Sequence, residues 1–205
     1  MSRLLTAAVA LALTVPVGSA PKLKDVPLLV YYPTRVGDRW VTETKYPDST
    51  AEVTEVVTAV ETKDDGLVVS IAREVDGRAS PDVSQVKVSD KGVFRLSQLG
   101  TAYDAPYCVL RLPLKPGAAW AAEVKRGGAT SSEFKYTAVK EEDIEVPAGK
   151  FRAFRIDVAI DRPGRPVEPV RASLWYAPRV GVVKHDYGDK ETGYVKVLKS
   201  FTPAK

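Results

Sequence analysis

The side chains that most often carry out catalysis are scarce in this sequence. His185 is the only histidine and Cys108 is the only cysteine, and the two are far apart in the chain. A serine triad would need His185 beside a serine on a sharp strand-to-helix turn, and no Gly-x-Ser-x-Gly motif provides one. His185 lies in an alternating run that begins at Val182. We therefore expect a hydrogen-bonded or solvated strand histidine and not a catalytic base.

The acidic clusters do not indicate a metal site, and the short motifs do not indicate a catalytic nucleophile. One histidine and one cysteine cannot form a typical zinc site, and neither Asp64-Asp65 nor Glu141-Glu142-Asp143 resembles an EF-hand loop. The tetrad Ser84-Gln85-Val86-Lys87 has the Ser-x-x-Lys spacing of penicillin-recognising enzymes, but that motif opens a helix and this tetrad begins a predicted strand. We expect no enzyme activity, no cofactor and no metal.

Large aromatic side chains remain as candidate ligand-binding residues. On the concave face of a curved sheet they would contact a lipid or another apolar ligand. The alternative is that they form the core, because a sheet must bury one face against something. The candidates are Trp40, Trp120, Phe154, Trp175 and Tyr176.

Two-residue alternation is the dominant pattern after residue 20. In the run 67–75, Leu67, Val69 and Ile71 share one face, and in the run 151–161 Phe154 and Ile156 do the same. Such alternation, with one polar face, is typical of antiparallel strands. Hairpin turns are predicted between these runs, at Asp64-Asp65-Gly66, Asp76-Gly77, Asp90-Lys91-Gly92 and Pro147-Ala148-Gly149.

The pattern predicts an all-β fold made of one large curved antiparallel sheet, as a half-barrel or a sandwich. The stretch from Leu96 to Pro113 is less regular, so we expect a long loop or a short helix there.

The first 20 residues have the layout of a secretory signal peptide. Arg3 precedes an apolar run over 4–17, and small residues close the segment at Gly18-Ser19-Ala20. The run is shorter than the roughly 20 residues that a membrane span needs. No cysteine stands directly after it, which argues against a lipid anchor. We expect cleavage after Ala20 or Ser19, and a soluble periplasmic or extracellular product that does not span a membrane, with residues 21–205 as a single β domain.

The charge of the chain argues against nucleic-acid binding, and its cysteine content argues against disulfide bonds. The chain has 30 Lys and Arg against 26 Asp and Glu, a net charge of +4, and the two signs are mixed along it. No basic run marks a nucleic-acid surface. A single cysteine permits no intramolecular disulfide.

The chain repeats one pattern. Pro33-x-x-x-Gly37-x-x-Trp40 matches Pro113-x-x-x-Gly117-x-x-Trp120, 80 residues further on. Similar strand and turn patterns follow in both halves, which would make 31–100 and 111–190 two copies of one unit. Chance likeness between β hairpins is the alternative.

Three segments carry a resemblance to known proteins. They are Tyr32-Pro33 with Val36–Trp40, the Pro-Ala-Gly-x-Phe pattern at 147–151, and the Trp-Tyr-Ala-Pro-x-Val-Gly-x-Val-Lys pattern at 175–184. In these the chain resembles uncharacterised exported bacterial β proteins, which are similar to the half-barrels typified by lipoprotein-localisation factors. The motifs make turns and hairpins and bring no catalytic residue. The resemblance implies a bent antiparallel sheet and an envelope role with a hydrophobic ligand.

We therefore expect an exported, non-enzymatic protein that binds a hydrophobic ligand or a lipid-bearing partner on the concave face of its sheet. The alternative is a structural or interaction module of the cell envelope that holds no small-molecule ligand. A cavity beside Trp40 and Trp120 would favour the first, and a solid core there would favour the second.

Overall fold

The computed structural model describes residues 31–63, 65–75, 77–163, 168–189 and 191–205. The predicted signal peptide lies outside these residues. Within them every regular element is a β-strand: β1 (Arg39–Lys45), β2 (Thr50–Lys63), β3 (Gly66–Val75), β4 (Arg78–Ser89), β5 (Gly92–Gln98), β6 (Thr101–Arg111), β7 (Ala119–Arg126), β8 (Ala129–Val146), β9 (Gly149–Asp161), β10 (Val170–Ala177), β11 (Gly181–Tyr187) and β12 (Tyr194–Thr202).

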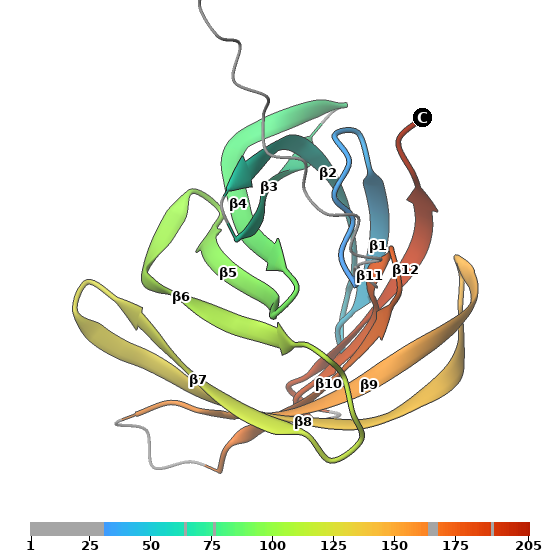
Figure 1. Cartoon of the computed structure of the whole chain (residues 1–205). Helices are drawn as coiled ribbons and strands as arrows, with labels where there is room; N and C mark the ends of the chain where they lie inside the picture. The colour runs from blue at the N-terminus through green and yellow to red at the C-terminus, as the bar shows by residue number, and fades with distance from the viewer. Residues whose placement is uncertain (1–30, 64, 76, 164–167, 190) are drawn as a thin grey trace, which may run out of the picture.

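These 12 strands form one antiparallel sheet in the order β6-β5-β4-β3-β2-β1-β12-β11-β10-β9-β8-β7. The first strand pairs with the last, with Trp40 opposite Phe201. The sheet curls until its edge strands, β6 and β7, lie side by side (Figure 1). The predicted curved antiparallel sheet is confirmed, and it bends beyond a half-barrel into a nearly closed, barrel-like sheet.

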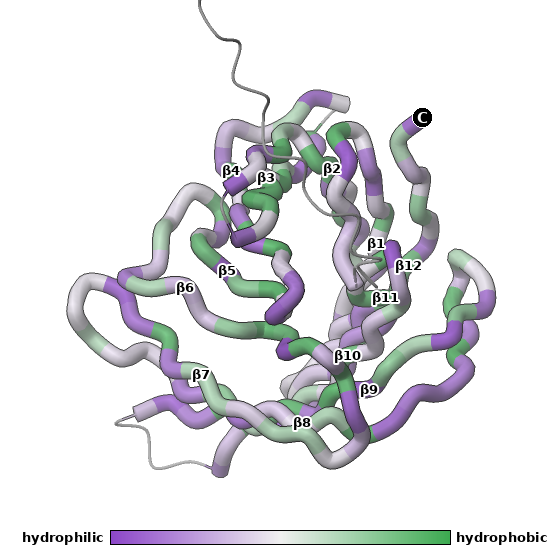
Figure 2. Tube along the Cα trace, viewed as in Figure 1, coloured by the Kyte–Doolittle hydropathy of each residue, from purple (hydrophilic) through white to green (hydrophobic). Residues whose placement is uncertain are grey.

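Alternation along the strands separates an inner face from an outer face, and hydrophobic and hydrophilic residues alternate accordingly along the trace (Figure 2). In β9, Ile156 has no exposed surface, and Phe154 is also buried. Arg155 and Asp157, which alternate with them along the strand, form an ion pair on the outer face. In β3, Val69 and Ile71 are likewise buried. The predicted apolar faces of these two strands therefore face the interior.

The stretch from Leu96 to Pro113 is neither a loop nor a helix, so that expectation was wrong. It contains the end of β5, a tight turn at Leu99 and Gly100, and the whole of β6. Alternation is lost because the pairing register shifts after Arg95↔Tyr107, which leaves residues 103–106 as a bulge. Pro106 is tolerated within that bulge on an edge strand, where its missing N–H breaks no ladder bond.

The two Pro-x-x-x-Gly-x-x-Trp motifs adopt the same local structure. Both glycines have a positive φ, +96° at Gly37 and +80° at Gly117. Their N–H groups donate to Val57 and Ala138 at 2.9 and 2.8 Å. Each turn places its tryptophan as the second residue of β1 or β7. Duplication of one ancestral unit remains a hypothesis.

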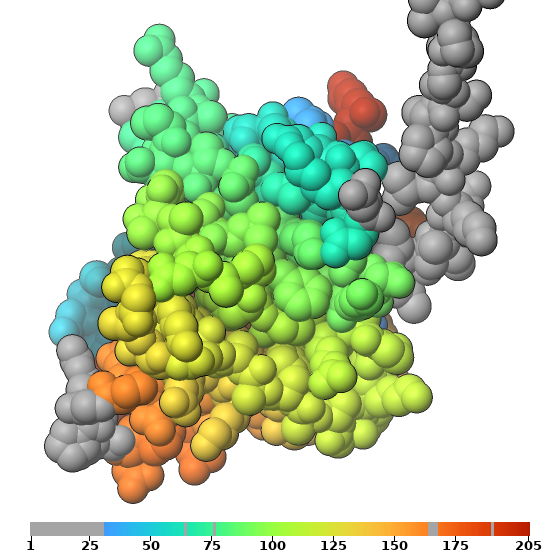
Figure 3. Space-filling view, turned by 60° about the vertical axis from the view of Figure 1, so that its left-hand side comes forward, coloured from blue at the N-terminus to red at the C-terminus, as the bar shows by residue number. Residues whose placement is uncertain are grey.

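Side chains close the seam between β6 and β7, because no backbone ladder joins these two strands in the described structure. The carboxylate of Asp104 accepts hydrogen bonds from the N–H groups of Gly127 and Gly128 at 2.9 and 2.8 Å. Indole Nε1 of Trp120 donates to the carbonyl oxygen of Cys108 at 3.4 Å. The atoms of the two strands meet along this side of the molecule (Figure 3).

The described residues include no helix that is both long and apolar enough to cross a membrane.

Candidate functional site

Four of the five predicted aromatic residues face the inside of the barrel, near one end of it. Trp40, Trp120, Phe154 and Tyr176 are 7%, 9%, 6% and 4% exposed, and all belong to the main core. Indole Nε1 of Trp40 donates to the carbonyl oxygen of Val180 at 2.8 Å. This end of the barrel is therefore packed with the protein's own side chains.

The fifth predicted residue, Trp175, is also buried, at 8% exposed, but it points to the outer face of the sheet. Its indole Nε1 donates to Glu142 at 2.8 Å, and Lys184 Nζ lies 4.6 Å from its ring centroid. Neighbouring residues of a strand point to opposite faces, so Trp175 and Tyr176 cannot share one. The five residues do not form a single surface.

Toward the middle and the other end of the barrel, several inward-facing side chains keep solvent-accessible surface. Strand register places them inside: Arg95 is opposite the buried residues Val86 and Tyr107, and His185 is opposite Leu174 and Lys196. These side chains therefore form a part of the inner face that solvent reaches. We call this half-buried set the lumen site: Glu55, Arg95, Phe134, Leu174, His185 and Lys196.

Charge in the lumen site is not balanced. Lys196 Nζ lies 3.8 Å from a carboxylate oxygen of Glu55, which makes a loose ion pair. Arg95 forms no ion pair with any described residue, and its Nε is buried without a hydrogen-bond acceptor. The set thus holds two cations and one carboxylate.

Tyrosines surround Arg95 as neutral hydrogen-bonding groups. Burial raises the pKa of Tyr176 to about 12, although the charge of Arg95 partly opposes that rise. Burial also raises the pKa of Tyr32 and of Tyr107, again against the effect of Arg95. The phenols therefore remain protonated and do not neutralise the guanidinium.

His185 is uncharged at neutral pH. Burial lowers its pKa to about 4, helped by the positive charges of Lys196 and Arg95 and opposed by Asp186. Its Nδ1 lies 3.4 Å from the hydroxyl oxygen of Tyr194. The sequence-based expectation of a hydrogen-bonded strand histidine agrees with this geometry.

We expect the protein to lose stability as the pH falls from about 6.5 to about 4, because His185 resists protonation in the folded state. The unfolded chain takes up a proton near pH 6.5, whereas the folded protein does so only near pH 4. Between these values the unfolded state binds more protons, so the free energy of unfolding should fall by up to about 3 kcal/mol. Urea unfolding at pH 7 and pH 4.5 measures this loss. His185→Gln should remove it, and an equal loss in that variant would assign the effect to carboxylates instead.

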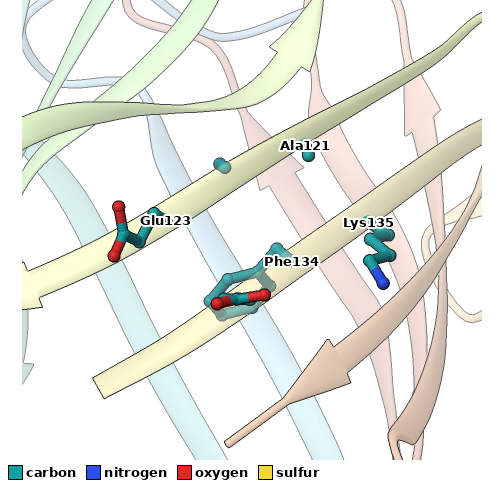
Figure 4. A pocket seen from close by; sticks show the side chains of 6 residues that line it. Ala121, Glu123, Phe134 and Lys135 are labelled. Carbon is teal, nitrogen blue, oxygen red and sulfur yellow. The ribbon is translucent and has the colours of Figure 1, made fainter. Parts of the chain in front are cut away.

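Two hollows border the lumen site, and Phe134 lines the first of them. One, of about 340 Å³, lies between β7 and β8 (Figure 4) and has no wall from a third strand. The other, of about 420 Å³, lies between the β1–β2 and β11–β12 hairpins, beside His185, and Tyr46, Tyr187 and Tyr194 line it. None of the five predicted aromatic residues lines either hollow. No group of three or more His, Cys, Asp and Glu side chains in the described ranges could hold a metal ion.

Sequence reasoning missed the lumen site, although a pattern in the sequence marks it. Arg95 follows Val93, and Glu55 lies between Val53 and Val57, so each places a charge at an inward position of an alternating run. A charge at such a position must find a partner or a ligand.

No protein-family model matches the sequence, and no curated protein matches it. Two solved structures resemble the fold. A protein of Bacteroides fragilis, described as exported with a YmcC-like fold, is 16% identical with a TM-score of 0.57, over 84% of this chain and 99% of that chain. A protein of Parabacteroides distasonis, described as a lipoprotein, is 18% identical with a TM-score of 0.53, over 84% and 98%. At these identities the likeness establishes a shared YmcC-like fold and nothing further.

Proposed function

We propose that the protein is exported and binds a hydrophobic ligand, without catalysis, in the partly filled interior of its barrel. The observation that supports binding is the exposure of apolar inner side chains. Leu174, in the middle of β10, and Phe134, in the first half of β8, face inward and are only half-buried, and Phe134 also lines the hollow between β7 and β8. If the barrel held no ligand, full burial of these side chains would stabilise the fold by about 25 cal/mol per Å² of apolar surface.

A second candidate function is a structural or interaction module of the cell envelope. The observation that favours it is the packing of Trp40 and Trp120 into the core. In that case the accessible surface in the lumen holds water, and partners dock on the outside.

A variant that fills the lumen separates these two functions. Leu174→Trp adds a large side chain at the centre of the lumen site, so we expect it to weaken binding of the fluorescent probe N-phenyl-1-naphthylamine at least tenfold. Val75→Trp adds the same group at a 61% exposed position of β3 and should leave binding unchanged. Circular dichroism checks that both variants fold.

Leu174→Ala gives a second measurement that does not depend on the larger side chain. It enlarges the lumen and should keep or increase probe binding. Equal binding by wild type, Leu174→Trp and Val75→Trp would place the probe on the outer surface and contradict a lumen ligand.

Native mass spectrometry of protein purified from its source tests occupancy directly. We expect a mass adduct that organic solvent extracts. Bare protein, together with no probe binding, would favour the structural module.

A further inference from the structure

Arg95 stands out because it is an inner-face cation without a counter-ion. A guanidinium stays protonated at any pH that a protein meets. Placing such a charge inside a protein costs several kcal/mol unless it is paired and hydrogen-bonded. Among the described residues, no carboxylate lies within ion-pair distance of Arg95, and its Nε–H has no acceptor.

The other inward-facing cation of the lumen site, Lys196, has a carboxylate partner within the barrel. Lys196 has Glu55 at 3.8 Å. Arg95 has no carboxylate partner among the described residues, and Val86 and Tyr107 lie directly opposite it on the flanking strands. Hence the fold itself provides an anion for one cation and not for the other.

We propose that Arg95 binds the anionic head group of a single-chain amphiphile, whose apolar tail lies along Leu174 and Phe134. This inference rests on the proposed function and names the ligand class. A planar guanidinium can hold a carboxylate or a phosphate through two parallel hydrogen bonds. The tyrosine hydroxyls near Arg95 add neutral donors for the same oxygens.

The two parts of the ligand match two parts of the lumen site. Phe134 stacks against Tyr107 with ring centroids 5.9 Å apart, and Tyr107 is the cross-strand neighbour of Arg95. An apolar surface therefore leads directly from the charged group. The net positive charge of the site favours an anionic head group over a neutral or cationic one.

The test compares ligands that share a tail and differ in the head group. Oleate, oleyl alcohol, oleyl phosphate and oleylamine are titrated into delipidated full-length protein by displacement of N-phenyl-1-naphthylamine. We expect the two anions to bind at least tenfold more tightly than the alcohol, and the amine to bind more weakly than the alcohol. The ratio of oleate to oleyl phosphate affinity identifies which anion fits, and acetate and inorganic phosphate show whether the head group binds alone.

Arg95→Met is the decisive variant, because methionine keeps the apolar stem and removes the charge. It should reduce oleate affinity about 10- to 100-fold and leave the alcohol unaffected. Lys196→Met should have a smaller effect, because Glu55 already pairs with that lysine. Arg152→Met, at the exposed β8–β9 hairpin, is the matched outer control and should change nothing.

Stability gives an independent readout. Removal of an unpaired buried charge should leave the ligand-free Arg95→Met protein as stable as wild type or more stable, whereas a purely structural arginine would destabilise the protein when replaced. Equal affinity of wild type for oleate and oleyl alcohol, unchanged by Arg95→Met, would overturn the anion site and leave hydrophobic binding intact. Failure of all four ligands and of the probe to bind would overturn the proposed function itself.

Discussion

Replacement of Gly92 by alanine should cost the protein at least about 3 kcal/mol of unfolding free energy, or prevent folding altogether. Gly92 begins β5 with φ at +141°, and its Cα faces the backbone of β6. A Cβ there would meet the carbonyl oxygen of Leu110 and lie 3.2 Å from the Cα of Arg111. Backbone of a paired strand cannot move aside as a flexible side chain can, so the strands would separate. Urea denaturation followed by tryptophan fluorescence measures the loss.

Gly149→Ala is the matched control for Gly92→Ala. Gly149 begins β9 after an equivalent hairpin, with φ at +126°, but a Cβ there meets nothing within 4 Å. It should lose only the cost of the backbone conformation, about 1–2 kcal/mol. If the two variants lost the same stability, the close approach of β5 to β6 would have no part in the effect.

Replacement of Trp120 by alanine should cost about 3–5 kcal/mol and loosen the seam between β6 and β7. Trp120 is 9% exposed, stacks on Tyr136 with centroids 5.1 Å apart, and donates to the carbonyl oxygen of Cys108 across the seam. No backbone ladder replaces these contacts. The half-buried Cys108 lies on the edge strand. Its thiol should therefore react faster with a disulfide reagent such as dithionitrobenzoate.

Trp40→Ala separates loss of packing from opening of the seam. Trp40 occupies the equivalent position of β1, where backbone pairing with β12 continues on both sides of it. Its stability loss should be similar, because it too is buried and hydrogen-bonded through its indole. Under native conditions Cys108 should remain as slow to react as in wild type. Faster labelling in both variants would mean that global unfolding exposes the thiol and that the seam is not a separate weak point.

The sequence predicted the strands well because each inner position is set by local alternation. Phe154 and Ile156, predicted to share a face, do so, and Gly66 and Gly149 make the expected hairpins. The failure at β6 has a physical cause. The bulge over 103–106 places Pro106 in a strand, and only the register with β5 reveals that such an edge strand exists.

Prediction of the candidate site was less complete. The four inner aromatic residues came together as the alternation required, but Trp175 was grouped with Tyr176 although adjacent strand residues face opposite ways. Arg95 was not singled out, because an arginine in a strand is usually on the solvated face. Its inward position follows from alternation with the buried Val93 two residues earlier, so the signal was present in the sequence but was not used.

Because β1 pairs with β12, the centre of the sheet joins the first and the last strand of the described chain. Asp38, just before β1, accepts a hydrogen bond from the N–H of Ala204 across 166 residues. Contacts at such separation form late, because the loop between them must first be closed against its entropy. A nascent chain therefore cannot complete this fold until its last strand has emerged. Under the proposed export as an extended polypeptide, this topology would delay folding until translocation is complete.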